Sequence, residues 1–259
     1  MLRTAAAALE AGFIAHRFNL RSCGGSEAHS RTSYHAGLTS DLRTFLQMLA
    51  AESRRPVVAA GFSLGGNIVL KLAGELGESA HGLLAGVCAT STPIDLEASA
   101  RRLAQPRNRA YERRFVRGLK RRIRHFPKAG LPFDRLASVR RLREFDELFT
   151  APAFGFRDAA EYYRTQSARR FLSGIRIPFL MIQAKDDPVV PFETFAGVPN
   201  LVAVDHGGHL GFLARRGPRF WVAATILEWV SSLTAGTGCS SSPGPSTAPE
   251  SAIQGCTPR

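Results

Sequence analysis

Short, continuous apolar runs alternate with amphipathic stretches in the first part of the chain. The run at 56–60 is apolar throughout, the pattern of a strand that is buried on both faces, and the apolar run at 82–89, rich in glycine and alanine, predicts another strand. A further run at 13–20 predicts another strand. Residues 41–51 carry leucine and phenylalanine at the spacing of an amphipathic helix, and residues 65–76 predict a second helix. Strands that alternate with helices favour an α/β fold with a mostly parallel sheet and helices on both faces.

The same alternation returns toward the C-terminal end. Apolar runs at 177–183 and 201–204 predict two more strands, and residues 219–233 predict a closing helix. Each of the two runs is followed by a loop that contains aspartate, and the second loop also contains histidine and glycine. In a parallel sheet, loops of this kind lie together at the carboxyl edge of the strands.

The long stretch between these two halves is mostly helical, polar and basic. Residues 93–173 therefore predict a helical cap, inserted into an α/β domain that spans residues 1–234. A chain of 259 residues is long enough to bury the core of one such domain. From residue 235 the chain is rich in glycine, serine, proline and threonine, so residues 235–259 are predicted to be a disordered tail.

The composition is that of an ordinary globular protein, with 44% apolar and 21% charged residues. No stretch approaches the ~20 apolar residues of a membrane span, which excludes an integral membrane protein. The chain starts like a signal peptide, but Glu10 interrupts the apolar run, which disfavours export. The four cysteines are scattered, with no CxxC pair and no histidine spaced to complete a zinc site. We therefore expect a reducing, cytoplasmic compartment, with no disulfide scaffold and no structural zinc.

The net charge of +13 comes almost entirely from one segment. Between Arg101 and Lys128 the chain has twelve basic residues and a single acid, Glu112. A charge run on a helix is most often a solvated face, and this is the first interpretation. The second is attraction of an acidic substrate or an anionic membrane surface. The third is nucleic acid, the least favoured partner, because no recognition motif accompanies the charges and aromatic interleaving is thin.

The clearest chemical signal is Gly61-Phe62-Ser63-Leu64-Gly65-Gly66, a G-x-S-x-G sequence between an apolar run and a helical pattern. A nucleophile elbow requires this context, because its serine stands on a tight strand-to-helix turn. The flanking positions need glycine there, which leaves the Ser63 hydroxyl exposed above the end of the strand. The Leu64 amide then points to where an oxyanion would form. The alternative is a glycine-rich turn in which the serine has no role.

A serine hydroxyl is a poor nucleophile without a base, and that base needs an acid to orient it. Where an elbow supplies the serine, the acid and then the histidine follow along the chain. We favour Asp187 as the acid, because it stands directly before a Pro-Val-Val-Pro segment, and Asp186 is the alternative. We favour His209 as the base, because two preceding glycines allow its loop to fold back, and His206 is the alternative. The other five histidines precede both aspartates and are interpreted as structural or surface residues: His16, His29, His35, His81 and His125.

As an ordered set, these motifs resemble the YheT-like α/β-hydrolases (type 4 of the AB hydrolase superfamily) over roughly residues 12–233. The matching segments are, in chain order, residues 19–26, 61–67, 95–111, 145–147, 155–156, 161–163, 186–188 and 207–212. The resemblance implies an α/β-hydrolase fold with an inserted helical cap. It also implies hydrolysis of carboxylic esters, including lipid or acyl esters, without a metal or another cofactor.

The family's pattern begins before this chain does, with early strands and a His-Gly loop that supplies the second oxyanion donor. Here Met1 falls in what the resemblance places as the helix after that loop, so the N-terminal strands are missing and only the Leu64 amide is assigned. Loss of one oxyanion donor typically costs about 10²–10³ in rate. We therefore expect either an N-terminally shortened form of a longer protein, which we favour, or an impaired enzyme.

The favoured hypothesis is a lipase-like serine esterase that acts through an acyl-enzyme. Ser63 would attack the acyl carbon, His209 would move the proton, and Asp187 would hold the imidazole. The cap would be a lid whose apolar face shapes the acyl pocket, and that face consists of Leu103, Phe115 and Leu119. The substrate would be a small-molecule ester or a lipid. Two alternatives stay open: a catalytically impaired α/β-hydrolase-like binding protein, and a basic surface that binds nucleic acid.

Overall fold

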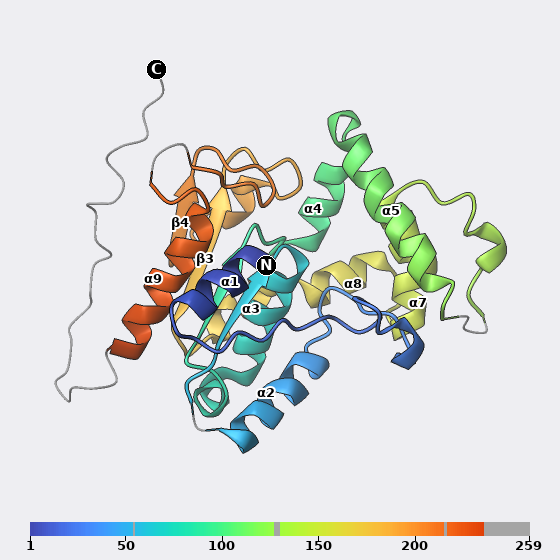
Figure 1. Ribbon diagram of the computed structural model, residues 1–259. Helices are drawn as coiled ribbons and strands as arrows, with labels where there is room; N and C mark the ends of the chain where they lie inside the picture. Colours follow the sequence, from blue (N-terminus) through green and yellow to red (C-terminus); the bar gives the residue numbers. More distant parts are fainter. Residues whose placement is uncertain (54, 127–129, 215–216, 236–259) are drawn as a thin grey trace.

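A parallel β-sheet forms the centre of the molecule, with helices on both of its faces (Figure 1). The computed structural model describes residues 1–53, 55–126, 130–214 and 217–235. Within these residues the sheet has the order β1-β2-β3-β4, and the strands are β1 (Val58–Phe62), β2 (Gly86–Thr90), β3 (Phe179–Ala184) and β4 (Leu201–Val204). The predicted tail at 235–259 lies, from residue 236 on, outside the described residues.

Most of the remaining described residues are helical or in loops. The α-helices are α1 (Leu2–Glu10), α2 (Ser40–Glu52), α3 (Leu64–Leu76), α4 (Leu96–Leu103), α5 (Arg109–Ile123), α6 (Leu142–Phe145), α7 (Ala151–Phe154), α8 (Ala159–Gln166) and α9 (Trp221–Ala235). A π-helical turn spans Asp146–Thr150, and short 3₁₀ helices span Glu27–His29, Gly77–Gly82, Pro106–Asn108, Phe133–Arg135, Ala168–Gly174 and Phe192–Phe195. None of the helices in the described part of the chain has the length and apolar character needed to cross a bilayer.

The two faces of the sheet bury two different hydrophobic clusters, as the period-2 geometry of a strand requires. In β2, Val87 belongs to the cluster that contains Ile68 of α3. The neighbouring Cys88 belongs to the cluster that contains Ile226 of α9. Helix α1 lies against α9, where the Arg3 guanidinium stands 4.6 Å from the centre of the Phe220 ring. The predicted α/β fold with helices on both faces of a parallel sheet is confirmed.

The chain between β2 and β3 leaves the sheet and forms a group of helices beside it (Figure 1). Helices α4 to α8 all lie in this stretch. They have a core of their own, in which Val116 and Ile123 of α5 pack with Phe145 and Phe149. A second cluster joins this group to the rest of the protein, because Leu96 of α4 and Tyr162 of α8 pack with Ala36 of the N-terminal loop.

The prediction of a strand at 13–20 is wrong. These residues have no regular secondary structure, and β1 is the last strand of the described sheet on this side. A strand forms through hydrogen bonds to a neighbour, and the described residues offer 13–20 no such neighbour. The apolar residues are used differently: Phe18 packs against the core, with its ring 5.3 Å from that of Phe45, while Ile14 is exposed.

The expectation that β1 is buried on both faces is also wrong, whereas β2 is buried throughout. All five residues of β2 are buried, since a strand lies on each side of it. In β1, Ala60 is exposed and only Gly61 is fully buried. An apolar sequence therefore predicted the strand itself, but its burial depends on neighbours that only the assembled sheet supplies.

Candidate active site

Ser63 stands on the turn between β1 and α3 in a strained backbone conformation. Its φ is 50° and its ψ is −122°, a combination that residues other than glycine rarely adopt. Two backbone hydrogen bonds hold the turn: the Ser63 amide donates to the Thr90 carbonyl oxygen (2.8 Å), and the Gly66 amide donates to the Ser63 carbonyl oxygen (2.9 Å). The turn therefore presents the hydroxyl at the carboxyl end of the sheet.

The glycines around Ser63 have different roles. A Cβ at Gly61 would lie 2.3 Å from the Gly65 carbonyl oxygen, and one at Gly66 would lie 1.9 Å from Thr92 Oγ1. Both positions exclude a side chain. A Cβ at Gly65 would meet nothing within 4 Å. The expectation that both flanking positions of the G-x-S-x-G sequence need glycine is therefore correct for Gly61. It is wrong for Gly65, where a side chain has room, and the second position that excludes a side chain is Gly66.

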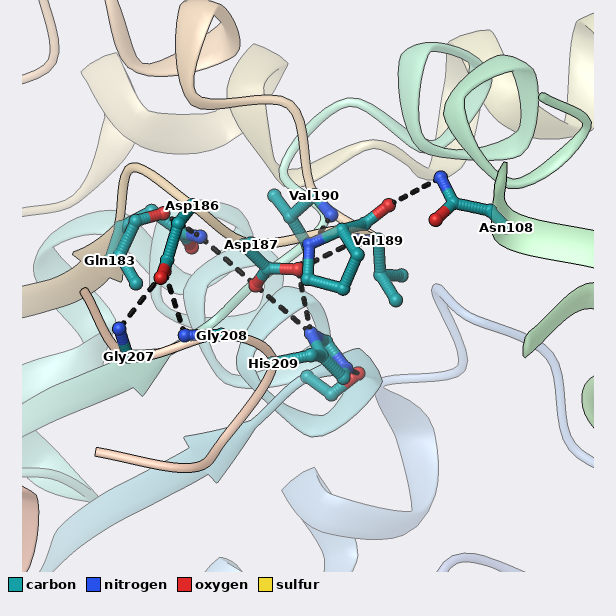
Figure 2. Close-up of polar contacts among 12 residues, drawn as sticks. Asn108, Gln183, Asp186, Asp187, Val189, Val190, Gly207, Gly208 and His209 are labelled. Atoms are coloured by element: carbon teal, nitrogen blue, oxygen red, sulfur yellow. Dashed lines mark hydrogen bonds and ion pairs between the residues drawn. The ribbon is translucent and has the colours of Figure 1, made fainter. Parts of the chain in front are cut away.

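Three distant side chains meet at this end of the sheet. Ser63 Oγ lies 3.0 Å from His209 Nε2. His209 Nδ1 lies 3.0 Å from Asp187 Oδ2 and 3.2 Å from Oδ1 (Figure 2). Ser63 follows β1, Asp187 follows β3 and His209 follows β4, so the parallel strands bring them together. Only 10% of the His209 side chain and none of the Asp187 side chain is exposed. Such a chain of hydrogen bonds can move a proton from a hydroxyl to an imidazole.

The Asp187 carboxylate is buried among donors that come mostly from its own loop. Its Oδ1 accepts hydrogen bonds from the amides of Val189 (2.8 Å) and Val190 (3.0 Å). Its Oδ2 accepts one from Gln183 Nε2 (3.1 Å), in the buried strand β3. These donors compensate for the water that burial removes from a carboxylate, and they fix the side chain toward His209.

The two alternative residues, Asp186 and His206, pair with each other instead. His206 Nδ1 lies 3.3 Å from Asp186 Oδ2, and the His206 side chain is 85% exposed. Asp186 Oδ1 accepts hydrogen bonds from the amides of Gly207 (2.9 Å) and Gly208 (2.8 Å) (Figure 2). Partial desolvation opposes ionisation of Asp186, but the bonds from Gly208, Gly207 and His206 outweigh it and hold the pKa of this carboxyl below its usual range.

Leu64, the residue assigned as oxyanion donor, is the first residue of α3. The first amides of a helix have no acceptor within the helix, and the helix dipole makes this end attractive to negative charge. The Leu64 side chain packs against the cluster of Leu96, Tyr162 and Ala36. The position next to Ser63 is therefore polar at the backbone and apolar at the side chain.

Sequence reasoning assigned no role to two buried asparagines, although both lie in segments that carry the family resemblance. Asn67, in α3, is fully buried: its Nδ2 donates to the carbonyl oxygens of Ala36 and Gln166 (both 2.9 Å), and its Oδ1 accepts from the Ala168 amide (2.8 Å). It ties the N-terminal loop and the end of the cap to the elbow helix. Asn108 is the second such residue. An asparagine within an apolar helix face is a signal for Asn67, but partners 31 to 101 residues away cannot be read from local pattern.

The interpretation of the other five histidines as structural or surface residues agrees with the position of His35, which is buried. Burial, and then the charges of Lys71 and Arg21, lower the pKa of His35 to about 4. Its ring makes edge contacts with Phe154 (4.6 Å between ring centres) and Phe156. His35 is thus a neutral, buried aromatic residue below the cap.

The apolar residues expected to shape an acyl pocket are used for packing. Leu103 is buried in the main core cluster, and Phe115 packs against that cluster. Leu119 packs with the core of the cap. The expected role of these three residues is therefore corrected: they hold the cap together and onto the sheet.

A family model described as the alpha/beta hydrolase family matches residues 2–223 of the chain. The chain belongs to the α/β-hydrolase family. Within it, the chain is YheT-like: it is 33% identical over 248 residues to the Escherichia coli (strain K12) protein YheT, named as an esterase. That match covers 90% of this chain and 72% of YheT.

Other relatives carry the names of lipid-acting enzymes. The monoacylglycerol lipase of Saccharomyces cerevisiae is 31% identical over 235 residues, which are 84% of this chain and 52% of that enzyme. The phospholipase ABHD3 of Mus musculus is 30% identical over 222 residues, which are 81% of this chain and 54% of that enzyme. The chain thus spans about half the length of these two relatives. Relatives named esterase, lipase and phospholipase support a hydrolase.

Two solved structures share the fold at lower sequence identity. The monoacylglycerol lipase of Paleococcus ferrophilus matches with a TM-score of 0.51 and 15% identity, over 89% of this chain and 88% of that one. A structure from the metagenome-derived lipolytic enzymes LipS and LipT matches with a TM-score of 0.54 and 18% identity, over 90% of this chain and 87% of that one. These two similarities bear on the fold alone.

Proposed function

We propose that this chain is a serine hydrolase that cleaves carboxylic esters through an acyl-enzyme. The observation that carries the proposal is the continuous set of hydrogen bonds from Ser63 Oγ through His209 to Asp187. The chain order serine, acid, histidine and the position of all three at the carboxyl end of a parallel sheet support it further.

The chemistry follows from the position of each atom. Ser63 Oγ attacks the acyl carbon while His209 Nε2 accepts its proton, and Asp187 holds the other ring nitrogen and stabilises the imidazolium. The Leu64 amide donates to the oxygen on which negative charge develops. His209 then gives the proton to the leaving alcohol. A water molecule, deprotonated in the same way, attacks the acyl-enzyme and releases the acid.

The substrate class that fits this site is a small-molecule ester or a lipid ester. The names of the yeast and mouse relatives refer to monoacylglycerol and to phospholipid. In this chain, the side chain of Leu64, the residue after Ser63, packs against an apolar cluster that contains Leu96, so the surroundings of the elbow are apolar. Turnover of p-nitrophenyl esters of increasing acyl length measures this preference.

Labelling with a fluorophosphonate probe tests the nucleophile. The wild-type chain is expected to label, and Ser63→Ala is expected to lose labelling. Ser91→Ala is a matched control, because Ser91 follows the next strand and also has a positive φ (49°). Equal labelling after Ser63→Ala would exclude the proposed nucleophile. A folded wild-type chain that neither labels nor turns over an ester would favour the impaired binding protein.

A second part of the proposal concerns the basic side of α5. Four exposed arginines lie on the side of this helix opposite the buried Glu112, Val116 and Ile123, and a fifth follows its last residue: Arg113, Arg114, Arg117, Arg121 and Arg124. Within the described residues, no ion pair or hydrogen bond of their side chains is present, whereas Arg141 pairs with Glu112 and Arg143 with Glu97. The positive charge of this side is therefore uncompensated.

We assign this arginine side of α5 to contact with an anionic membrane surface, since basic residues are attracted to anionic lipid headgroups. Co-sedimentation with vesicles that contain phosphatidylglycerol should fall after Arg117→Glu/Arg121→Glu. Arg17→Glu/Arg43→Glu changes the net charge equally on exposed residues outside α5 and should bind as the wild type does. Equal loss in both pairs would mean that only net charge matters. Salt-sensitive retardation of an oligonucleotide, without vesicle binding, would favour nucleic acid instead.

A reducing, cytoplasmic location completes the proposal. It rests on the cysteines, of which Cys23 and Cys88 are free thiols. Fractionation of cells that express the tagged protein tests it.

A further inference from the structure

Asn108 is a buried polar residue of the cap that reaches the loop of Asp187. It ends the short helix Pro106–Asn108, at the corner between α4 and α5, and is 2% exposed. Its Nδ2 donates two hydrogen bonds. One goes to the Arg102 carbonyl oxygen at the end of α4 (2.8 Å). The other goes to the Pro188 carbonyl oxygen (2.7 Å) and is the dashed line at Asn108 in Figure 2. The second bond joins residues 80 positions apart in the chain.

A local role as a helix cap does not account for this arrangement. Asparagine is among the favoured residues at the N-cap position, where its side chain accepts a hydrogen bond from the first turn. Asn108 occupies the N-cap position of α5, yet its side chain makes no capping hydrogen bond. The amide is directed instead toward α4 and the Asp187 loop, so its contribution is tertiary.

The hydrogen bond to Pro188 acts on the peptide group that holds the acid. The Pro188 carbonyl and the Val189 amide belong to one planar peptide unit, so fixing the direction of the oxygen also fixes the direction of the N–H. That N–H donates to Asp187 Oδ1 at 2.8 Å. A carbonyl that accepts a hydrogen bond also makes the N–H of the same peptide a stronger donor. Asn108 therefore orients and polarises a donor of Asp187.

We propose that Asn108 is a positioning residue for the Ser63–His209–Asp187 set: it aligns the Pro188–Val189 peptide so that Asp187 holds the imidazole of His209. This inference rests on the proposed function. It also means that the cap and the acid loop share one buried contact, so the position of the cap and the alignment of the acid are coupled.

A double-mutant cycle tests the proposal. Asn108→Ala should lower kcat for a p-nitrophenyl ester, and the rate of fluorophosphonate labelling, roughly tenfold with KM little changed, because the Pro188–Val189 peptide loses the hydrogen bond that orients it. In an Asp187→Ala background the same substitution should have almost no further effect, because the group through which it acts is gone. A residue that only supports the fold of the cap would raise KM and would add its effect in both backgrounds.

Glu193→Gln is the matched control. Glu193 lies on the same loop and pairs with Arg102 of the cap at 3.5 Å, but its side chain is largely exposed. It should react as the wild type does. If circular dichroism shows that Asn108→Ala does not fold, Asn108→Ser replaces it in the double-mutant cycle, because serine keeps one hydrogen-bond donor.

The outcomes separate the two proposals. A wild-type chain that does not label overturns the proposed function and the role of Asn108 with it. A wild-type chain that labels, together with unchanged kcat in the Asn108 variants or with equal losses in both backgrounds, overturns the positioning role alone.

Discussion

Two aspartate–histidine pairs lie beside each other at the carboxyl end of the sheet. The two aspartates are adjacent in the chain, and the two histidines lie on one loop. Asp187 and His209 form the inner pair, with the carboxylate fully buried and only 10% of the imidazole exposed. Asp186 and His206 form the outer pair, with the side chains 41% and 85% exposed. The same two residue types therefore occur in two very different surroundings.

The difference shows which features fit an aspartate–histidine pair to the catalytic role proposed for Asp187 and His209. The inner carboxylate receives amide donors and Gln183, and the imidazole it holds reaches Ser63. The outer carboxylate receives the amides of Gly207 and Gly208, the two residues before His209. Burial and the direction of the donors distinguish Asp187, which faces the imidazole of His209, from Asp186. The Asp186 carboxylate accepts hydrogen bonds from the loop that carries His209 and so holds that loop in place.

The largest contrast is expected between the two histidines. His209→Ala should reduce kcat by about 10⁵ or more, the scale seen when the base of a triad is removed. His206→Ala should change it by no more than about twofold, since exposed substitutions rarely exceed ~0.5 kcal/mol. Initial rates on a p-nitrophenyl ester measure both. A large loss for His206→Ala with a small one for His209→Ala would reverse the assignment.

The two aspartates should differ less strongly. Asp187→Ala should reduce kcat by about 10⁴, because the imidazole loses the group that holds its tautomer. Asp186→Ala should reduce it by about tenfold, because the loop of His209 loses one hydrogen-bond acceptor. Active-site labelling rates distinguish the two effects. Similar losses of kcat in both variants would mean that Asp186 contributes to the reaction as much as Asp187 does.

A third aspartate sharpens the comparison through stability instead of activity. Burial raises the pKa of Asp146 to about 6, although hydrogen bonds from Thr150 and Tyr163 counteract it. The folded protein then binds a proton that the unfolded chain, with a pKa of about 3.9, has released, so stability falls as the pH rises from 4 to 6. We expect a loss of roughly 3 kcal/mol, from 1.36 kcal/mol per pKa unit.

Urea denaturation at several pH values between 4 and 7 measures this slope. Asp146→Asn should remove this pH dependence of stability. The control Asp134→Asn, at an exposed position of the same cap, should leave it unchanged. An equal slope in the wild type and in Asp146→Asn would contradict the buried-acid interpretation.

The smallest effect is expected for the stability contributed by the outer carboxylate. The pKa of Asp186 is lowered in the folded state, so its stabilisation is present above the unfolded value of about 3.9 and is lost as the pH falls through the folded value. Asp186→Ala should cost about 1 kcal/mol at neutral pH, a small figure because solvent screens a partly exposed group. Thermal unfolding should show that the difference in stability between the wild type and Asp186→Ala is smaller at pH 3 than at pH 7. A difference that is larger at pH 3 would argue against this assignment.

Much of the secondary structure could be predicted because its signals are local. The run at 201–204 matches β4, and the helices predicted at 41–51 and 65–76 match α2 and α3 within one residue at each end. The strand predicted at 13–20 failed for the opposite reason. Its apolar residues carry the pattern of a strand, but a strand also needs a neighbour with which to share hydrogen bonds.

The candidate site shows the same division. Ser63 could be chosen from its context, and Asp187 and His209 could be preferred over Asp186 and His206 from the residues around them. Their catalytic roles stay proposals that the variants above test. Asn108 and Asn67 could not be found in this way, because their hydrogen-bond partners lie far away in the chain.

By itself, the sequence determined the alternation of strands and helices, the elbow at Ser63 and the order of the acid and base loops. These features depend on periodicity and on turn chemistry, which act over a few residues. Only the tertiary structure decided which aspartate faces which histidine, which glycines must lack a side chain, and where the cap contacts the acid loop. Those choices depend on distances between segments that become neighbours only when the sheet is assembled, and on the burial that this assembly imposes.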